Sequence, residues 1–213
     1  MFNKPSVYFI LGTANAGRRD PLHILGEALE GGISHFQLRE KGTGALTGQA
    51  LKDFALQCQK LCRARNVPFI VNDDVALACD INADGIHVGQ EDADAAAVKK
   101  RIGKNMILGV SVHSVEEAEN AIKNGADYLG MGPVYGTKSK SDAKEPSGVT
   151  KILKVRERFP DTPVIGIGGI TSLNAGPVWD AGAEGVAVIS AIAESDNAEQ
   201  EVKHILNAYK GGS

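Results

Sequence analysis

The segments Val164-Ile165-Gly166-Ile167-Gly168-Gly169-Ile170 and Gly185-Val186-Ala187-Val188-Ile189-Ser190 are short apolar runs edged by glycine, and a helical stretch follows each of them. Each run is typical of a buried parallel strand. Bare backbone after two neighbouring parallel strands leaves unpaired N–H groups that can bind a dianionic phosphate. In a (β/α)₈ barrel the loops after the last two strands often do this, so the two runs predict both a fold and an anion site. The alternative is that the glycines serve only tight turns and close packing.

The same alternation of short apolar and longer amphipathic stretches runs through the rest of the chain. Strands are predicted at residues 7–11, 35–39, 69–72, 85–88, 107–111, 128–131, 164–167 and 185–189. Helices are predicted at residues 21–30, 46–64, 75–80, 93–102, 115–124, 149–159, 172–181 and 198–209. This pattern indicates one α/β domain over residues 1–213, a (β/α)₈ TIM barrel with a disordered tail at 211–213. A doubly wound sheet is the competing fold, but no G-x-G-x-x-G motif follows the first predicted strand.

Composition limits the classes of partner. The chain has 213 residues, 43% of them hydrophobic, and a formal net charge of −3, which does not favour a nucleic acid partner. It has no signal-peptide pattern and no apolar stretch long enough to span a membrane, so we expect a cytoplasmic protein. Cys58 and Cys62 lie one helical turn apart and are expected, with Cys79, to be buried free thiols rather than a metal or redox pair.

Polar residues at the end of the second predicted strand indicate an anion site. Gln37, Arg39 and Lys41 share one face because side chains alternate along a strand, while Phe36 and Leu38 point toward the helices. Two cations facing the mouth of a barrel are costly unless an anion meets them. A surface ion pair between Arg39 and Glu40 is the alternative, although those residues lie on opposite faces.

Carboxylates follow the third and fourth predicted strands. Asp73 and Asp92 would repel each other at neighbouring strand ends unless a cation lay between them, so they are candidate ligands of Mg²⁺. The alternative is that such residues are helix N-caps, which is as plausible as the metal role for Asp74 and Glu91.

Further candidates lie after the fifth and sixth predicted strands. Ser111 could donate a hydrogen bond to a phosphate oxygen, and His113 could be an acid or base, although a capping histidine is commoner. The long connection at 132–148 is rich in Lys, Ser and Gly, which favours a lid over an anionic substrate rather than a solvated insertion. The other histidines are expected to be structural: His35 and His87 within strands, His23 and His204 on helices. No nucleophile is paired with a base in sequence, so the residues favour departure of a diphosphate assisted by charge neutralisation.

Taken in order, these motifs resemble those of the thiamine-phosphate synthase family from the second strand to the last helix. Seven stretches carry the resemblance: Gln37-Leu38-Arg39-Glu40-Lys41, Val71-Asn72-Asp73-Asp74, Asp84-Gly85-Ile86-His87-Val88-Gly89-Gln90-Glu91-Asp92, Gly109-Val110-Ser111, Gly132-Pro133-Val134-Tyr135 with Thr137, Ser139 and Lys140, Gly166-Ile167-Gly168-Gly169-Ile170, and Val188-Ile189-Ser190. The resemblance implies a Mg²⁺-dependent transferase of thiamine biosynthesis with two small-molecule substrates, 4-amino-2-methyl-5-hydroxymethylpyrimidine diphosphate and hydroxyethylthiazole phosphate. It implies a dissociative mechanism and gives thiamine monophosphate and pyrophosphate as products.

The resemblance also implies roles for single residues. It places the diphosphate on Gln37, Arg39, Lys41, Asn72, Ser111, Ser139 and Lys140, of which Arg39, Lys41, Ser111 and Lys140 would be catalytic. It places Mg²⁺ on Asp73 and Asp92, and the thiazole phosphate on Thr137, Gly169, Ile189 and Ser190. The family commonly has threonine where Ser139 stands, and both side chains supply a hydroxyl.

Two other functions stay open at this point. A thiazole tautomerase-like relative would share the barrel and the phosphate site and could use His113, but it would have no need of the pair Asp73 and Asp92. A non-catalytic phosphate-binding barrel would leave the cations and carboxylates unexplained. The sequence leaves protein partners and oligomeric state undetermined.

Overall fold

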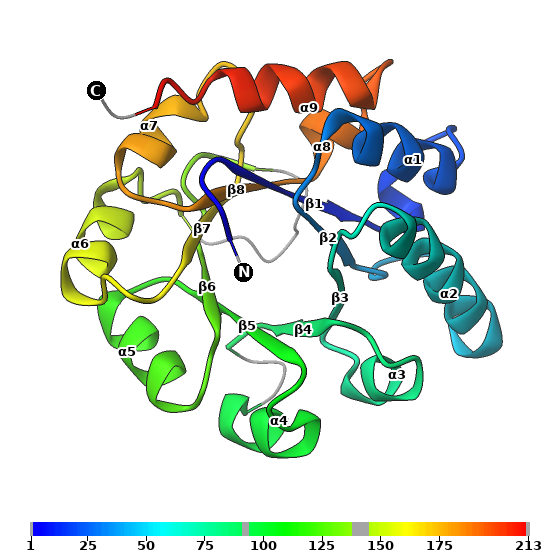
Figure 1. Cartoon of the computed structure of the whole chain (residues 1–213), viewed down its shortest axis with the longest axis horizontal. Coiled ribbons are helices and arrows are strands. Elements are labelled where there is room, and N and C mark those ends of the chain that lie inside the picture. The colour runs from blue at the N-terminus through cyan, green and yellow to red at the C-terminus, as the bar shows by residue number, and fades with distance from the viewer. Residues whose placement is uncertain (1, 91–93, 138–144, 212–213) are drawn as a thin grey trace.

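The computed structural model of the chain describes residues 2–90, 94–137 and 145–211 and contains one closed, parallel barrel (Figure 1). Every neighbouring pair of strands is parallel, and β1 closes the ring by pairing with β8 through Ser6 opposite Gly185. The predicted (β/α)₈ fold is therefore confirmed. The strands are β1 (Ser6–Leu11), β2 (His35–Leu38), β3 (Phe69–Asn72), β4 (Gly85–Val88), β5 (Ile107–Val112), β6 (Tyr128–Met131), β7 (Val164–Ile167) and β8 (Gly185–Val188).

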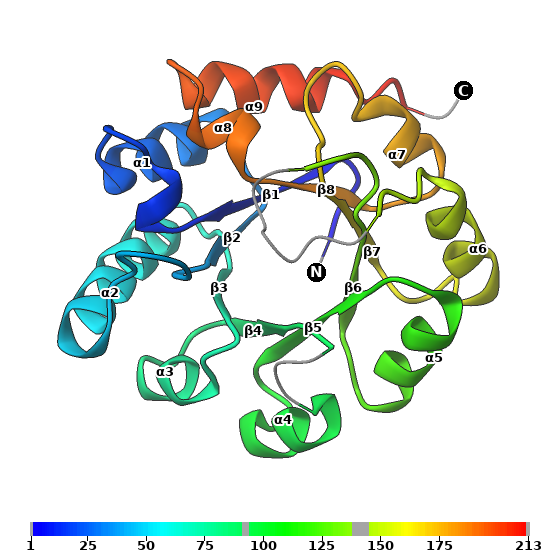
Figure 2. The same cartoon turned by 180° about the vertical axis from the view of Figure 1, so that it is seen from behind.

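Helices surround the strands on the outside, as the opposite view in Figure 2 also shows. A short 3₁₀ turn, η1 (Thr13–Asn15), follows β1. The helices are α1 (Pro21–Gly31), α2 (Gly48–Ala64), α3 (Val75–Asp80), α4 (Ala95–Ile102), α5 (Val115–Lys123), α6 (Thr150–Arg158), α7 (Gly176–Asp180), α8 (Ser190–Ala193) and α9 (Ala198–Asn207).

The period of two along each strand separates an outer core from an inner one. In β1, Val7 and Phe9 belong to the cluster that packs under the helices, whereas Tyr8 and Ile10 point into the barrel. Phe36 and Leu38 also belong to the outer cluster, as predicted. Full burial of a side chain such as Phe9 contributes about 1.5–3 kcal/mol, so the outer cluster supplies much of the driving force for closure.

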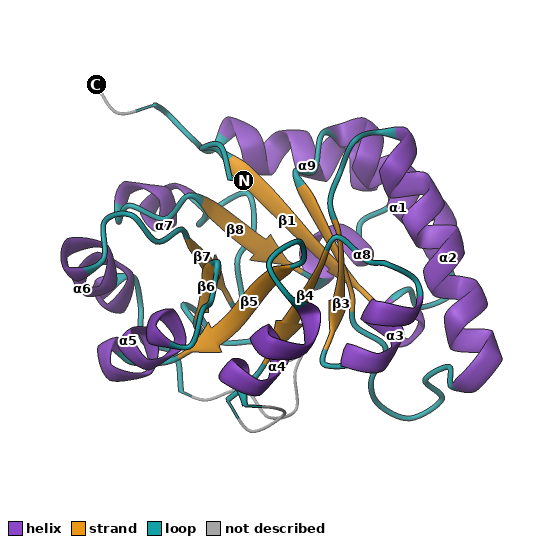
Figure 3. Ribbon diagram, turned by 60° about the horizontal axis from the view of Figure 1, so that its bottom comes forward, coloured by secondary structure: helices purple, strands orange, loops and turns teal. Residues whose placement is uncertain are grey.

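The two ends of the barrel differ. At the end where the strands begin, the ring of Phe2 stacks on His35 with 3.9 Å between centroids and also packs on Tyr8 and Tyr128. The strands run toward the other rim, as the side view in Figure 3 shows. The residues that end the strands therefore meet at one rim, which is where barrel enzymes place their chemistry.

Several predicted bounds differ from the structure by one or two residues: the helix at 198–209 ends at Asn207, and the strand at 35–39 ends at Leu38. The alternation expected to place Gln37, Arg39 and Lys41 on one face therefore stops before Arg39. Two bounds near the C-terminus are wrong for a visible reason. The helix predicted at 172–181 begins only at Gly176, because Asn174 bonds locally: its Oδ1 accepts from Thr171 N (2.8 Å) and its Nδ2 donates to the Gly169 carbonyl (3.0 Å). Such side-chain bonds compete with helix formation. The strand predicted to reach 189 ends at Val188, since Ile189 caps α8, a short helix absent from the predicted list.

The three cysteines are free, as predicted, but Cys79 is only partly buried. Cys58 and Cys62 are buried and free, and burial raises the pKa of both thiols, so neither is a reactive thiolate at neutral pH. Within the three described ranges we also find no helix with the length and hydropathy of a membrane span.

Candidate active site

A large cavity at the ends of β7 and β8 brings together residues from four loops. It has a volume of about 740 Å³ and is lined by Ala14, Asn15, Gly17, Gly136, Thr137, Ile167, Gly168, Gly169, Ile170, Thr171, Ala187, Ile189, Ser190 and Glu194. We call it the glycine cavity. All four residues that the resemblance assigned to the thiazole phosphate, Thr137, Gly169, Ile189 and Ser190, line it. The loop after β1 also contributes, which the sequence did not indicate.

The backbone conformation and close packing after β7 require glycine at two positions. Gly168 has a φ of 103° and Gly169 a φ of 63°, a region that side chains rarely adopt. A Cβ on Gly168 would lie 2.6 Å from the Cβ of Pro133, and one on Gly169 would lie 2.4 Å from the carbonyl oxygen of Gly136. The backbone amides of Val134 and Tyr135 donate to the carbonyls of Ile167 (2.8 Å) and Gly168 (3.0 Å). The loop after β6 is thus packed directly on the loop after β7.

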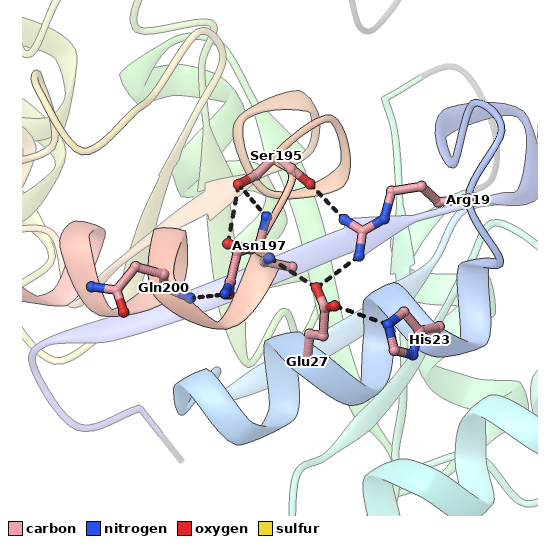
Figure 4. Close-up of polar contacts among 7 residues, drawn as sticks. Arg19, His23, Glu27, Ser195, Asn197 and Gln200 are labelled. Atoms are coloured by element: carbon pink, nitrogen blue, oxygen red, sulfur yellow. Dashed lines mark hydrogen bonds and ion pairs between the residues drawn. The ribbon is translucent and has the colours of Figure 1, made fainter.

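A polar cluster anchors the segment that follows Ser190 (Figure 4). Arg19 donates to the Ser195 carbonyl and, at 2.8 Å, to the Glu27 carboxylate. Glu27 also accepts from the backbone amide of Ala198 (2.9 Å), and Asn197 caps α9. The hydrogen bond from Arg19 lowers the pKa of Glu27, so this carboxylate stays ionised at neutral pH and its stabilising effect is lost only as the pH falls through that lowered value. The cluster therefore ties the connection between α8 and α9 to α1.

A second cavity lies at the ends of β2 and β3. It has a volume of about 260 Å³, and we call it the carboxylate cavity. Among its lining residues are Lys41, Asn72 and Asp73, which the sequence had placed in one site. Asp73 Oδ2 pairs with the Lys41 ammonium and accepts from Asn72 Nδ2 at 2.6 Å. Strand ends that are distant in sequence thus converge on one carboxylate.

Asp73 has two features of a functional carboxylate. Its Oδ1 is buried and has no hydrogen-bond partner within the described residues. Its φ is 61°, a left-handed backbone that a non-glycine residue adopts at some cost, and its backbone amide donates to the His87 carbonyl (2.9 Å). An unsatisfied buried oxygen at a strained backbone position makes Asp73 a candidate for contact with a bound group.

Of the neighbouring acidic residues, two are helix N-caps and two lie outside the described residues. Asp74 caps α3 by accepting from Leu77 N at 2.9 Å, so the capping alternative is correct for this residue. Asp94 caps α4 in the same way. Glu91 and Asp92 lie outside the described residues, as do Ser139 and Lys140. Within the residues that are described, no three His, Cys, Asp or Glu side chains cluster as a metal site.

Gln37 and Ser111 lie inside the barrel, below the rim. Gln37 is only 2% exposed, and both residues line a small inner cavity with Tyr8, His87 and Tyr128. Sequence analysis gave His87 a structural role within a strand and did not single out the two tyrosines. The signal was available, because each stands at an inward position of its strand, alternating with outer-core residues such as Val7, Ile86 and Leu129.

Arg39 and His113 differ in how they relate to the site. Arg39 follows β2, where its backbone amide donates to the Leu11 carbonyl (2.9 Å), and it is not among the described residues that line the three cavities. His113 bonds to Glu117 through Nδ1 (2.9 Å) and through its backbone amide (2.6 Å), beside the N-cap Ser114. This is the capping arrangement that the sequence offered as the alternative to acid–base chemistry.

Glu40 has a structural role that the sequence did not reveal. Its carboxylate accepts from the backbone amides of Thr13 (2.8 Å) and Leu46 (3.0 Å) and from the Thr13 hydroxyl. It thereby ties the loop after β1 to the loop after β2. An ion pair with Arg39, the alternative considered above, is not among the contacts of the described residues.

Replacing Glu40 with glutamine is expected to lower the free energy of unfolding by about 1–3 kcal/mol, because an amide nitrogen would face a backbone donor in place of an acceptor. Urea unfolding of Glu40→Gln measures this. Glu30→Gln is the matched control, since Glu30 is half exposed and pairs with Arg65 at the surface. Equal unfolding midpoints for the two variants would contradict the proposed role of Glu40.

Comparison with known proteins extends the likeness over the whole barrel. The family described as "Thiamine monophosphate synthase" matches residues 7–192. A thiamine-phosphate synthase of Lysinibacillus sphaericus (strain C3-41) is 53% identical over 196 residues, which cover 92% of each chain. One from Geobacillus kaustophilus (strain HTA426) is 51% identical over 210 residues, covering 99% of this chain and 94% of the relative. The solved structure of a thiamine phosphate pyrophosphorylase from Pyrococcus furiosus superposes with a TM-score of 0.86 at 33% identity, covering 97% and 96% of the two chains.

Proposed function

The chain belongs to the thiamine monophosphate synthase family, and from this premise we propose the reaction that it catalyses. It is a transferase of thiamine biosynthesis that forms thiamine monophosphate, as its relatives' names state. Its substrates are 4-amino-2-methyl-5-hydroxymethylpyrimidine diphosphate and hydroxyethylthiazole phosphate, and its second product is pyrophosphate. A tautomerase role has no support from the relatives described above.

The observation that carries the proposal is the presence of two cavities of different chemistry at the ends of the strands. Besides apolar side chains, the carboxylate cavity presents Lys41, Asn72 and the carboxylates of Glu40, Asp73 and Asp74, so it suits a diphosphate only together with a metal ion. The glycine cavity offers bare backbone at Gly169 and the hydroxyls of Thr137 and Ser190, which suit a monophosphate. A reaction that joins a diphosphate to a monophosphate needs both.

Mg²⁺ is proposed as the cofactor, held by Asp73 and Asp92. The fit rests on Asp73, because its buried Oδ1 has no partner among the described residues and a hard cation prefers carboxylate oxygen. When bound, Mg²⁺ supplies positive charge that stabilises the departing diphosphate. Because Oδ2 pairs with the Lys41 ammonium, Oδ1 would be the atom that holds the cation.

In the proposed mechanism the C–O bond between the pyrimidine methylene and the diphosphate breaks first, and its electron pair leaves with pyrophosphate. Lys41, Arg39, Ser111 and Lys140 stabilise the negative charge that grows on the leaving oxygens. The lone pair of the thiazole nitrogen then forms the new C–N bond with the pyrimidine-stabilised carbocation. No proton is transferred, which accounts for a set of catalytic residues without a general base.

Incubating the protein with both substrates and Mg²⁺ is expected to yield pyrophosphate and thiamine monophosphate in equal amounts. Omission of either substrate, or chelation of Mg²⁺ with EDTA, should abolish both products. A coupled pyrophosphate assay together with chromatography of thiamine monophosphate measures this. Undiminished turnover in EDTA would refute the metal assignment alone, and absence of thiamine monophosphate under all conditions would refute the function.

A further inference from the structure

Five side chains form a continuous hydrogen-bonded chain across the interior of the barrel, which we call the relay. It begins at Gln37, whose Nε2 lies 3.0 Å from the Tyr8 hydroxyl. That hydroxyl lies 2.7 Å from the hydroxyl of Tyr128. His87 continues the relay, with Nδ1 2.9 Å from the Tyr128 hydroxyl and Nε2 2.9 Å from the Ser111 hydroxyl. The relay therefore joins two residues of the proposed diphosphate site through three residues that have no assigned role.

When the histidine is neutral and every hydroxyl proton between Gln37 and His87 is donated within the relay, only two directions are consistent, and the reverse one requires Gln37 to turn its Oε1 toward Tyr8. Each hydroxyl carries a single proton, and a neutral imidazole donates from one nitrogen and accepts at the other. In the forward direction the Gln37 amide donates to Tyr8, Tyr8 donates to Tyr128, and Tyr128 donates to His87 Nδ1. The imidazole then holds its proton on Nε2 and donates to Ser111. In the reverse direction the Ser111 hydroxyl donates its proton to Nε2 of the imidazole, which then carries its own proton on Nδ1.

The two directions present opposite groups to a substrate. In the forward direction the Ser111 oxygen accepts from His87 and keeps its own proton free to donate outward. In the reverse direction Ser111 can offer only lone pairs, which would repel a phosphate oxygen. A diphosphate at Ser111 is therefore compatible with the forward direction alone.

We propose that a diphosphate bound at Ser111 polarises the relay in the forward direction, so that His87 carries its proton on Nε2 and the amide of Gln37 donates into the barrel. Tyr8, Tyr128 and His87 are then positioning residues, which orient the hydroxyl that meets the diphosphate. The inference rests on the proposed function, because that function places the diphosphate there.

Burial keeps the two tyrosines of the relay neutral. Tyr8 and Tyr128 are 2% and 1% exposed, and burial raises the pKa of both phenols, so neither loses its proton under ordinary conditions. In an environment of low dielectric constant each hydrogen bond is strong and an unpaired group is costly, so one end of the relay constrains the other. The forward direction also leaves the Gln37 Oε1 as an acceptor, so an anion at one end sets the polarity of an amide across the barrel.

The tautomer of His87 tests the direction. Carbon-13 and nitrogen-15 chemical shifts of histidine-labelled protein distinguish the Nε2–H tautomer, the Nδ1–H tautomer and the doubly protonated ring. Loss of a signal in His87→Gln assigns the residue. With inorganic pyrophosphate and Mg²⁺ as the probe we expect the Nε2–H tautomer. A ring protonated on Nδ1, or on both nitrogens, overturns the proposal.

Tyr128→Phe tests the positioning role, because it removes the link that donates to Nδ1. We expect a mixture of tautomers and about a tenfold or greater fall in kcat, with KM for the thiazole phosphate within about threefold of the original value. Tyr209→Phe, the same change beside Trp179 and just after α9, should alter neither. An unchanged tautomer in folded Tyr128→Phe contradicts the relay. If the original protein shows the Nε2–H tautomer but forms no thiamine monophosphate, the proposed function fails and the polarity of the relay does not.

Discussion

Replacing Asp73 with asparagine is expected to lower the rate of pyrophosphate release by about 10²–10³-fold while the fold persists. Asparagine has the same shape and tolerates the left-handed backbone at this position, where φ is 61°, so the change removes a charge without disturbing the chain. The lost negative charge weakens the proposed hold on Mg²⁺, whose stabilising effect is greatest as the C–O bond breaks. Steady-state pyrophosphate release across a Mg²⁺ titration measures the effect. Asp92→Ala is expected to act in the same direction.

Asp74→Asn provides the control for this experiment, because it alters the adjacent carboxylate. Asp74 caps α3 through Leu77 N, and asparagine is an equally good cap, so both turnover and stability should stay close to the original values. The assignment of Asp73 is wrong if Asp73→Asn keeps near-normal turnover with an unchanged Mg²⁺ requirement. It is also wrong if the two variants lose activity equally.

Replacing Gly169 with valine is expected to weaken binding of the thiazole phosphate by about 100-fold or more. A β-branched residue is strained at a φ of 63°, and its Cβ would lie 2.4 Å from the Gly136 carbonyl oxygen and 2.9 Å from the Cβ of Tyr135. The loop must therefore move, and the glycine cavity changes shape. Single-turnover kinetics with saturating pyrimidine diphosphate and varied thiazole phosphate measure the apparent affinity.

Gly26→Ala is the matched control, because Gly26 lies in α1 with nothing within 4 Å of an added Cβ. It should bind the thiazole phosphate normally and gain a little stability, since alanine favours a helix over glycine by about 1 kcal/mol. Normal binding by Gly169→Val would show that the backbone at this position does not hold the phosphate.

The elements were predictable where a local pattern decides them. Strands at 69–72, 85–88, 128–131 and 164–167 have the observed bounds, because an apolar run between turn residues has few other ways to be buried. The prediction failed where side chains bond to nearby backbone. The side chain of Asn174 bonds to nearby backbone where the first turn of the helix at 172–181 was predicted. Ile189 is the N-cap residue of α8 and not the last residue of a strand. Local composition does not reveal which of several competing hydrogen bonds the tertiary structure will favour.

The candidate site was predictable in its membership more than in its architecture. Lys41, Asn72 and Asp73 line one cavity and Thr137, Gly169, Ile189 and Ser190 another, since residues that end parallel strands meet at one rim. The position of Gln37 and Ser111 inside the barrel, below the rim that the other site residues occupy, was not predicted. Both follow the same inward alternation as Tyr8 and Tyr128, but the sequence alone does not set how far below the rim a side chain lies.

By itself the sequence determined the order of strands and helices and which face of each strand is apolar, because both follow from periods of two and 3.6 residues along a single chain. Only the tertiary structure decided which inward side chains touch. The relay joins side chains from β1, β2, β4, β5 and β6, and closure of β8 on β1 holds these strands in one ring. Its distances depend on strand tilt and register around the whole barrel. These are set by packing among residues far apart in the chain, which no local pattern encodes.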